Sequence, residues 1–387
     1  MRDRVRARYR RFVLSEVVSG RAGETNVPVK VIICAMKPRQ RVRFTSAGDG
    51  ARLAWADSGA GPPVVKAANW LTHLEYEWES PVWKHWIEFF SLHGRLVRYD
   101  ERGCGMSDPN VGRQSVDQWT DDLEAIIEAA RLPSPVTLLG ISQGSTTCIG
   151  YAARHPDKVA GLILYGGYAR GAFNRDPPGA EPVYRAMIQL ARAAWGKDNP
   201  TFRQVFTSRF IPGGSPEQLK WFNDLCLNTT TGIAAASLLE ARAAVNITDL
   251  LAKVQVPTLV LHARNDEVVP IAEGRFLASR ISGAEFVELD SRNHILLANE
   301  PAWYRFREAV LSFLKPGGEA RGAAFQSLSP RERQVLTLMT DGLSNAEIAK
   351  RMCLSEKTVR NHASSLFEKL DVDSRAQAIV LVRDHGL

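Results

Sequence analysis

Cysteine is scarce and scattered in this sequence. Its 387 residues include only five cysteines, and no two of them form a C-x-x-C pair: Cys34, Cys104, Cys148, Cys226 and Cys353. An odd number without close spacing argues against a disulfide framework and against a zinc site. We therefore expect most of these thiols to be buried as small apolar groups, and we expect no metal and no cofactor.

Long apolar runs are missing as well. No run reaches the roughly 18 residues that a membrane-spanning helix needs, and no signal-peptide core follows the arginine-rich start. These absences argue against a membrane protein and a secreted protein, so we expect a cytoplasmic chain that does not contact a membrane. The length predicts about two domains.

The basic charge of the chain is unevenly placed. Of a net charge of +7, residues 1–35 contribute eight basic against three acidic groups, whereas residues 325–387 contain nine basic and eight acidic groups. Net charge therefore gives no support to DNA binding by the C-terminal part. Residues 1–40 are either a basic, disordered extension or sequence upstream of a true start at Met36, and a basic DNA-binding arm fits them less well.

Short apolar segments alternate with helical segments between residues 41 and 166. The first two expected strands, 41–46 and 51–57, would form a hairpin. The later alternation of strand and helix predicts an α/β fold with a mostly parallel sheet. The other expected strands are 63–68, 95–100, 136–141, 159–166, 257–263 and 284–289.

The helical segments outline the domains. Helices are expected at 80–92 and 118–130, and a last one at 301–314 closes a first domain at 41–315. Within it, residues 167–250 have helical patterns and no good strand, as in a lid. Residues 316–326 are rich in glycine and alanine and are expected to be a linker. Residues 327–387 are expected to be a separate all-α domain of about four short helices.

One short motif suggests a nucleophile. The segment LLGISQGSTT has the form G-x-S-x-G at its centre, with Ser142 between an expected strand and an expected helix. A reactive serine needs a base, an acid that orients the base, and donors for the oxyanion. Asp266 and His294 each follow a later strand, where functional groups of open α/β sheets collect. Alone, each could be a turn former or a surface histidine, but three matches in order favour catalysis.

Residues 41–315 resemble the α/β-hydrolase superfamily, and RYDERGCGMSD at 98–108 matches its stretch after the fourth strand. The resemblance implies Ser142 as nucleophile, His294 as base and Asp266 as orienting acid. Where many members have His-Gly, this sequence has Ala68-Asn69, so Trp70 falls at one oxyanion-donor position, and Gln143 would be the second donor. Lys66, inside an otherwise apolar strand, has no explanation in the sequence.

The type of nucleophile narrows the chemistry. Epoxide hydrolases and haloalkane dehalogenases of this superfamily have aspartate at the elbow, whereas serine points to acyl transfer on an ester, lactone, thioester or amide. We expect apolar and aromatic side chains from NWLTHLEYEW and from the lid to form the pocket wall. That wall favours a small, mostly apolar ligand.

The C-terminal segment closely resembles the LuxR-type helix-turn-helix domain. The resemblance rests on LSPRERQVL, GLSNAEIA, LSEKTVRNH and KLDVDSRAQA. Ser329, Ser344 and Ser355 have the pattern of helix N-caps. The alternative is a four-helix protein-interaction module with solvated charges.

The helix that begins after Ser355 would read double-stranded DNA. Val359, Leu366 and Leu370 fit its inner face. The resemblance places base contacts at Arg360, Asn361 and Ser364, and we expect phosphate contacts at Lys357, Thr358 and Lys369. Residues 374–385 would pair two copies in a homodimer through Ala376, Ile379 and Val380.

Three functions remain open. The protein is a transcription regulator that senses a small acyl ligand, a serine hydrolase (esterase or lactonase) with an accessory DNA-binding tail, or a DNA-binding protein with a hydrolase-like dimerisation scaffold. Fold alone does not choose among them. The complete triad argues against the scaffold, and the DNA-reading helix argues against a metabolic enzyme. Our leading hypothesis is the regulator, with hydrolysis of the ligand by the triad as part of it.

Overall fold

The computed structural model describes residues 40–109, 114–175, 180–197, 199–314, 327–370, 372 and 374–385. The expected N-terminal extension and the expected linker lie outside these residues. In the described ranges, no helix is both long and apolar enough to span a membrane. The cysteines there are free thiols, of which Cys104, Cys148 and Cys226 are buried and Cys353 is exposed.

An eight-stranded sheet forms the centre of the larger domain. Its spatial order is β1-β2-β4-β3-β5-β6-β7-β8. The β1–β2 and β2–β4 pairs are antiparallel and all others are parallel, as the sequence predicts. The strands are β1 (Arg41–Ser46), β2 (Arg52–Ser58), β3 (Pro63–Lys66), β4 (Arg95–Tyr99), β5 (Val136–Ile141), β6 (Val159–Tyr165), β7 (Thr258–Ala263) and β8 (Glu285–Leu289).

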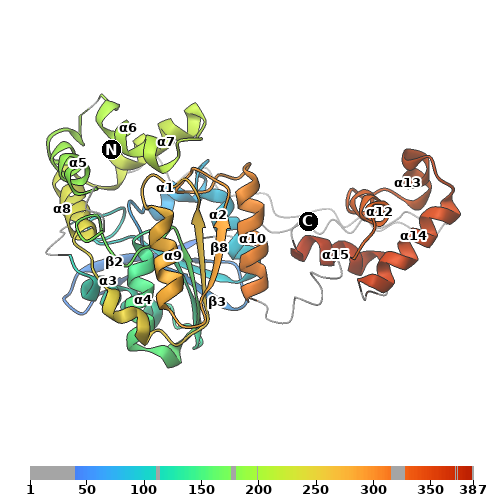
Figure 1. Cartoon of the computed structure of the whole chain (residues 1–387), viewed down its shortest axis with the longest axis horizontal. Helices are drawn as coiled ribbons and strands as arrows, with labels where there is room; N and C mark the ends of the chain where they lie inside the picture. Colours follow the sequence, from blue (N-terminus) through green and yellow to red (C-terminus); the bar gives the residue numbers. More distant parts are fainter. Residues whose placement is uncertain are drawn as a thin grey trace, which may run out of the picture. The chain divides into compact units, whose positions relative to one another are not determined.

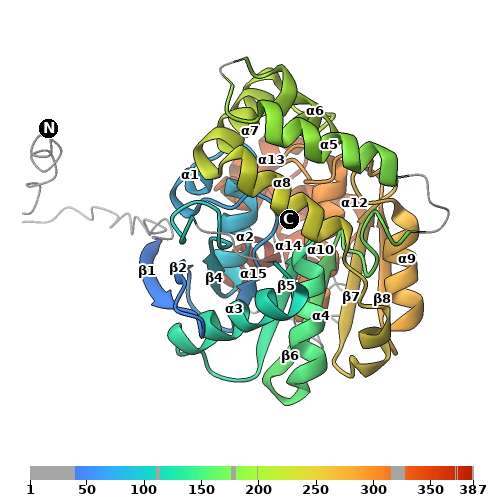
Figure 2. The same cartoon turned by 90° about the vertical axis from the view of Figure 1, so that its left-hand side faces the viewer.

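Helices cover both faces of this sheet (Figures 1 and 2). Helices α2 (Lys84–His93) and α10 (Pro301–Leu314) share one face, where the rings of Trp86 and Phe306 pack 4.6 Å apart. The other face carries α3 (Val116–Ala129), α4 (Gly144–Arg154) and α9 (Ile271–Arg280). Because both faces are covered, the central strands are continuously apolar, and all six residues of β7 are buried.

Four helices between β6 and β7 form a separate layer beyond the strand ends, on top of the domain in Figure 2. They are α5 (Glu181–Ala194), α6 (Thr201–Phe210), α7 (Pro216–Thr229) and α8 (Gly232–Ala243). Among the described residues of 167–250, pairing of extended backbone is limited to one bridge between Arg170 and Asn246. This layer occupies the place expected for a lid, and we call it the lid below. A short helix, α1 (Leu74–Trp78), precedes α2.

The C-terminal residues form a small all-α domain with its own apolar core. Its helices are α12 (Pro330–Thr340), α13 (Asn345–Met352), α14 (Glu356–Lys369) and α15 (Arg375–His385). Ser329, Ser344 and Ser355 cap the first three, and the first two caps are complete capping boxes. Val335, Ile348 and other apolar side chains from these helices are buried together.

Candidate functional site

Ser142 lies at a sharp turn between β5 and α4. Its backbone has a φ of +52°, in the left-handed region that L side chains rarely adopt. The strand and the helix approach so closely that a Cβ at Gly140 would lie 2.5 Å from Cα of Ser145. Beside the turn, a Cβ at Gly144 would lie 3.1 Å from the carbonyl oxygen of Ala67. The two glycines thus permit the turn that the motif predicts.

Asp266 and His294 meet in the loops that follow β7 and β8. His294 Nδ1 lies 2.6 Å from Asp266 Oδ2, and both side chains are buried. The other carboxylate oxygen accepts the N–H groups of Val268 at 2.8 Å and Val269 at 2.9 Å. Burial alone would raise the pKa of Asp266, but the charge and hydrogen bond of His294 outweigh it and hold this pKa below its usual value. The carboxylate therefore stays ionised and orients the imidazole.

The second ring nitrogen of His294 is free to act as a base. Within the described residues, Nε2 is buried and has no hydrogen-bond partner. The Ser142 turn lies close to this imidazole. The N–H of Ser142 donates to the carbonyl oxygen of Tyr165 at 2.8 Å, and Gly166, the residue after Tyr165, lies against the His294 ring. Serine, aspartate and histidine therefore follow the parallel strands β5, β7 and β8 at one edge of the sheet, with β6 between β5 and β7.

Sequence reasoning missed a second histidine beside the carboxylate. His262, in β7, is fully buried, with Nε2 3.7 Å from Asp266 Oδ2 and 2.8 Å from the carbonyl oxygen of Val269. Burial lowers the pKa of His262, although the charge of Asp266 opposes this. The neutral ring donates to Val269 and so fixes the turn that holds Asp266. A histidine four positions before the acid is the only signal in the sequence.

The expected oxyanion donors lie in two turns next to the serine. Gln143 directly follows it, and Trp70 follows β3 in a loop where Leu71 has a φ of +57°. The Trp70 side chain is buried against the lid, with its ring 5.8 Å from that of Trp195 and 6.4 Å from that of Phe206. Packing of Trp70 against the lid therefore holds this loop, in which Ala68-Asn69 stands where many α/β-hydrolases have His-Gly.

Lys66 gains an explanation from this loop. Its ammonium group donates to the side-chain oxygen of Asn69, whose Nδ2 lies 3.4 Å from the carbonyl oxygen of Trp70. The Lys66 ammonium group also lies 5.2 Å from the ring centre of Trp83. Burial lowers the pKa of Lys66 to about 8. The lysine thus ties the end of β3 to the loop that carries the expected donor.

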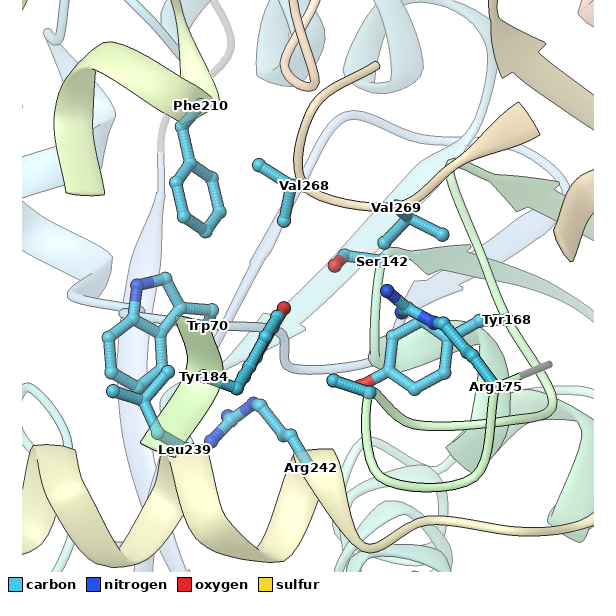
Figure 3. A pocket seen from close by; sticks show the side chains of 11 residues that line it. Trp70, Ser142, Tyr168, Arg175, Tyr184, Phe210, Leu239, Arg242, Val268 and Val269 are labelled. Atoms are coloured by element: carbon cyan, nitrogen blue, oxygen red, sulfur yellow. The ribbon is translucent and has the colours of Figure 1, made fainter. Parts of the chain in front are cut away.

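A pocket of about 370 Å³, solvent-facing space included, opens onto Ser142. Its wall is partly as expected and partly not. Aromatic and aliphatic side chains dominate, but two arginines take part, and of NWLTHLEYEW only Trp70 reaches the pocket. The wall is therefore mostly aromatic and aliphatic with two cationic side chains, and the expected small, mostly apolar ligand stays a prediction. Figure 3 shows the lining: Trp70, Ser142, Tyr168, Ala172, Arg175, Tyr184, Phe210, Leu239, Arg242, Val268 and Val269.

Helix α14 has the two faces that DNA reading requires. Val359 and Leu366 are fully buried in the small core. Arg360, Asn361 and Ser364 are exposed on the opposite side. The three expected base contacts therefore share one accessible surface, which we call the reading face.

The expected phosphate contacts differ in availability. Lys357 is exposed. The hydroxyl of Thr358 lies 2.8 Å from that of Ser355 and belongs to the helix cap. Lys369 Nζ lies 2.8 Å from a carboxylate oxygen of Glu332 and so joins α14 to α12. No pattern in the sequence indicates this ion pair. Because it joins α14 to α12, Lys369 has a structural role.

The expected dimer surface on α15 is only partly described. Ala376 is exposed and Ile379 is half-buried, whereas the side chain of Val380 lies outside the described residues. Ala378 and Val382 are buried in the core of the small domain. The helix therefore has an inner face that packs on its own domain, and Ala376 lies away from it.

Comparisons with known families match both domains. The serine aminopeptidase S33 family matches residues 79–302, more than half of the chain, and the luxR family of bacterial regulatory proteins matches residues 326–382. The AB hydrolase superfamily protein YisY of Bacillus subtilis is 27% identical over 266 residues, 67% of this chain and 92% of that protein. The 3-oxoadipate enol-lactonase 2 of Acinetobacter baylyi is 28% identical over 238 residues, 60% of this chain and 84% of that protein.

Solved structures resemble the larger domain. The enol-lactonase from Burkholderia xenovorans LB400 is 26% identical, with a TM-score of 0.59, and the match covers 70% of this chain and 99% of that one. An esterase from Exiguobacterium antarcticum has a TM-score of 0.60 over 71% of this chain and 100% of its own. At 23% identity, the esterase supports the fold alone.

Proposed function

The chain belongs to the serine aminopeptidase S33 family of α/β-hydrolases and ends in a LuxR-type DNA-binding domain, and from this premise we propose that it is a transcription regulator that binds and cleaves a small acyl ligand. The observation that carries the proposal is the buried His294–Asp266 pair beside the Ser142 elbow, in the same chain as a DNA-reading helix. Relatives whose names specify an enol-lactonase support an ester or a lactone as the ligand class.

The proposed reaction follows acyl transfer through a triad. Ser142 Oγ attacks the carbonyl carbon while His294 Nε2 takes the hydroxyl proton, and ionised Asp266 stabilises the resulting imidazolium. The N–H groups of Trp70 and Gln143 hold the oxyanion. His294 then gives the proton to the alcohol oxygen as it leaves the acyl carbon. A water molecule, deprotonated by His294, attacks the acyl carbon, and His294 passes that proton to Ser142 Oγ as the bond to the serine breaks and the acid is released.

The regulatory half of the proposal rests on the reading face. Arg360 suits guanine and Asn361 suits adenine in the major groove, and both are exposed on a helix whose other side is anchored in the domain core. Lys357 adds a phosphate contact at the start of that helix. Ligand binding or cleavage in the larger domain would then set or time the DNA-bound state.

Turnover of short-chain p-nitrophenyl esters and of a lactone panel tests the catalytic half. We expect the intact protein to hydrolyse at least one of these compounds and Ser142→Ala to lose about 10³-fold or more in kcat. Ser279→Ala is the matched control, because that hydroxyl is exposed on α9 and only donates to its own helix. Both variants should still bind DNA, which verifies folding.

The alternatives give different results. No turnover by folded, DNA-binding protein would contradict cleavage and leave a receptor pocket. Serine-dependent turnover that never alters DNA binding would instead favour the second candidate, a serine hydrolase with an accessory DNA-binding tail. The preformed His294–Asp266 pair is the observation that favours this second candidate.

A further inference from the structure

The pocket beside Ser142 is positively charged. Arg175 and Arg242 both line it, and no acidic side chain does so among the described residues. Arg242 comes from lid helix α8, and Arg175 comes from the segment that leads from β6 into the lid. Figure 3 shows Arg242 at the bottom of the view, below Tyr184, and Arg175 at the right, beside Tyr168 and below Val269. Cationic groups in such a wall need a reason, because burying charge is costly.

Arg242 has N–H groups without a hydrogen-bond partner among the described residues. Its side chain is buried, and Nη2 donates to Glu101, which is also buried. The guanidinium lies 5.1 Å from the ring centre of Trp70 and 5.8 Å from that of Trp119. Nε and Nη1 have no hydrogen-bond partner within the described residues. Each of these nitrogens keeps an N–H for a ligand, although the two do not share one bidentate edge, because Nη1 lies on the Cδ side of the guanidinium and the Nε–H points away from it.

Arg175 supplies the net charge. Glu101 balances the charge of Arg242, but no described acidic group pairs with Arg175, whose Nε donates to the carbonyl oxygen of Arg170 at 3.1 Å. By contrast, Arg170 is paired with Glu273 at 2.7 Å. The Arg175 guanidinium lies 5.3 Å from the ring centre of Tyr168, at the pocket wall.

We propose that the ligand of this site carries a carboxylate in addition to its ester or lactone carbonyl. The carboxylate accepts a charge-assisted hydrogen bond from an unpartnered N–H of Arg242 under the influence of Arg175, while the carbonyl lies at Ser142. The aromatic and aliphatic remainder of the wall suits a short carbon chain between the two groups. This inference rests on the proposed function for the position of the carbonyl, whereas the carboxylate site stands on the arginines alone.

Matched pairs of methyl esters test the proposal. Monomethyl glutarate and methyl pentanoate differ only by a terminal carboxylate in place of a methyl group, as do monomethyl adipate and methyl hexanoate. Hydrolysis is followed by titration of the released acid at constant pH. We expect the intact wild-type protein to prefer the charged ester by about 10-fold or more in kcat/KM, as a charge-assisted hydrogen bond allows.

Variants of the two arginines separate the carboxylate site from the triad. Arg175→Gln and Arg242→Lys should each lower the preference ratio toward one. Lysine at 242 keeps the charge beside Glu101, which protects the fold, but it loses the planar guanidinium and its unpartnered N–H donors. Arg192→Gln is the control, because Arg192 is half-exposed on α5 and pairs with Glu240 rather than lining the pocket, and its ratio should equal that of the wild type.

Different failures identify different errors. Ser142-dependent hydrolysis with a ratio near one, unchanged in Arg175→Gln, would overturn the carboxylate site and leave the hydrolase intact. If no ester is cleaved, calorimetric titration of Ser142→Ala with monomethyl glutarate and with methyl pentanoate decides the matter. Binding of monomethyl glutarate alone, weakened when Arg175→Gln is added, would support the carboxylate site without catalysis, and no difference between the two esters would overturn it.

Discussion

Ser142 and Gly166 both adopt left-handed backbone conformations, with φ values of +52° and +57°. At Ser142 the strain exposes the hydroxyl at the tip of a turn, a use of strain that is common at functional sites. At Gly166 the same conformation brings the backbone directly behind the imidazole. A Cβ there would lie 3.2 Å from His294 Cε1 and 3.6 Å from Asp266 Oδ2. The missing side chain thus leaves room for the His–Asp pair.

Gly166→Ala should impair catalysis more than it impairs folding. We expect a loss of about 1–2 kcal/mol in the free energy of unfolding from the positive φ. We also expect a drop of roughly 10- to 100-fold in kcat, since small displacements of a catalytic group are costly. Ester turnover and urea denaturation measure the two effects. Gly283→Ala is the control, with a φ of +70° and nothing within 4 Å of its Cβ. Equal kcat values in both variants would contradict the contact argument.

The sequence was a good guide to the site residues that follow strands. Ser142, Asp266 and His294 each come after an apolar strand, and parallel strands bring such positions to one edge. Arg242, Arg175 and the second histidine gave no comparable signal. The role of Arg242 depends on its ion pair with Glu101, which is 141 positions away in the chain. Pairings of that kind have no periodicity to reveal them.

At the scale of elements, the strands were predicted to within one or two residues of their observed ends, because buried parallel strands are short and continuously apolar. Within residues 167–250, the helical patterns at 181–195, 216–227 and 232–244 predict three helices, which correspond to α5, α7 and α8. Helix α6 (Thr201–Phe210) had no expected counterpart. It interleaves Arg203, Thr207 and aromatic residues on its buried side, so its pattern is weak. Arg203 Nη1 donates there to the backbone carbonyl oxygens of Trp195 and Lys197.

The contact between α12 and α14 depends on one carboxylate. Glu332 accepts from Lys369, from the hydroxyl of Ser365 at 2.7 Å and from the N–H of Ser329 at 2.7 Å. Burial would raise the pKa of Glu332, but these hydrogen bonds outweigh it and lower the pKa to about 2, from an ordinary value of 4.5. The ionised form of Glu332 is therefore more favourable in the folded domain than in the unfolded chain.

Glu332→Gln should therefore destabilise the small domain in a pH-dependent way. Because the folded pKa is lowered, the stabilisation is complete above pH 4.5 and is lost as the pH falls toward about 2. We expect a loss of about 1–2 kcal/mol at pH 7 and the same loss at pH 5, and a smaller loss at pH 3. Urea denaturation of residues 327–387, which have their own core, measures it. Glu368→Gln, exposed on α14 beside Lys369, is the control, and a difference independent of pH would contradict the assignment.

On the scale of the whole molecule, the chain joins two folding units with separate apolar cores. The resemblances to an α/β-hydrolase and to a LuxR-type domain, both inferred from motifs, are confirmed by the family matches. Residues 325–387 have a net charge close to zero. Their affinity for DNA must therefore come from where the basic side chains lie on the surface and not from the net charge. Separate cores also mean that any effect of the ligand on DNA binding is a coupling free energy, to be measured in the intact chain.

Covalent occupation of Ser142 should change the affinity of the intact protein for DNA. A p-nitrophenyl alkylphosphonate would phosphonylate the serine and imitate the acylated state. The probe is a duplex that the unlabelled protein selects from random sequence, and Kd is measured by fluorescence anisotropy. We expect a change of about 5-fold or more in either direction, the lower end of common allosteric coupling. The physical reason is that a ligand shifts an equilibrium only by its unequal affinity for two states.

Two variants make this measurement decisive. Ser142→Ala, exposed to the same reagent, should keep the unlabelled Kd, since it has no nucleophile to modify. Ser279→Ala should be labelled and should respond like the wild type. Mass spectrometry establishes complete labelling. Full phosphonylation with an unchanged Kd would contradict sensing and leave a hydrolase with a DNA-binding tail, whereas a shift that persists in Ser142→Ala would show that the reagent acts elsewhere than at the elbow.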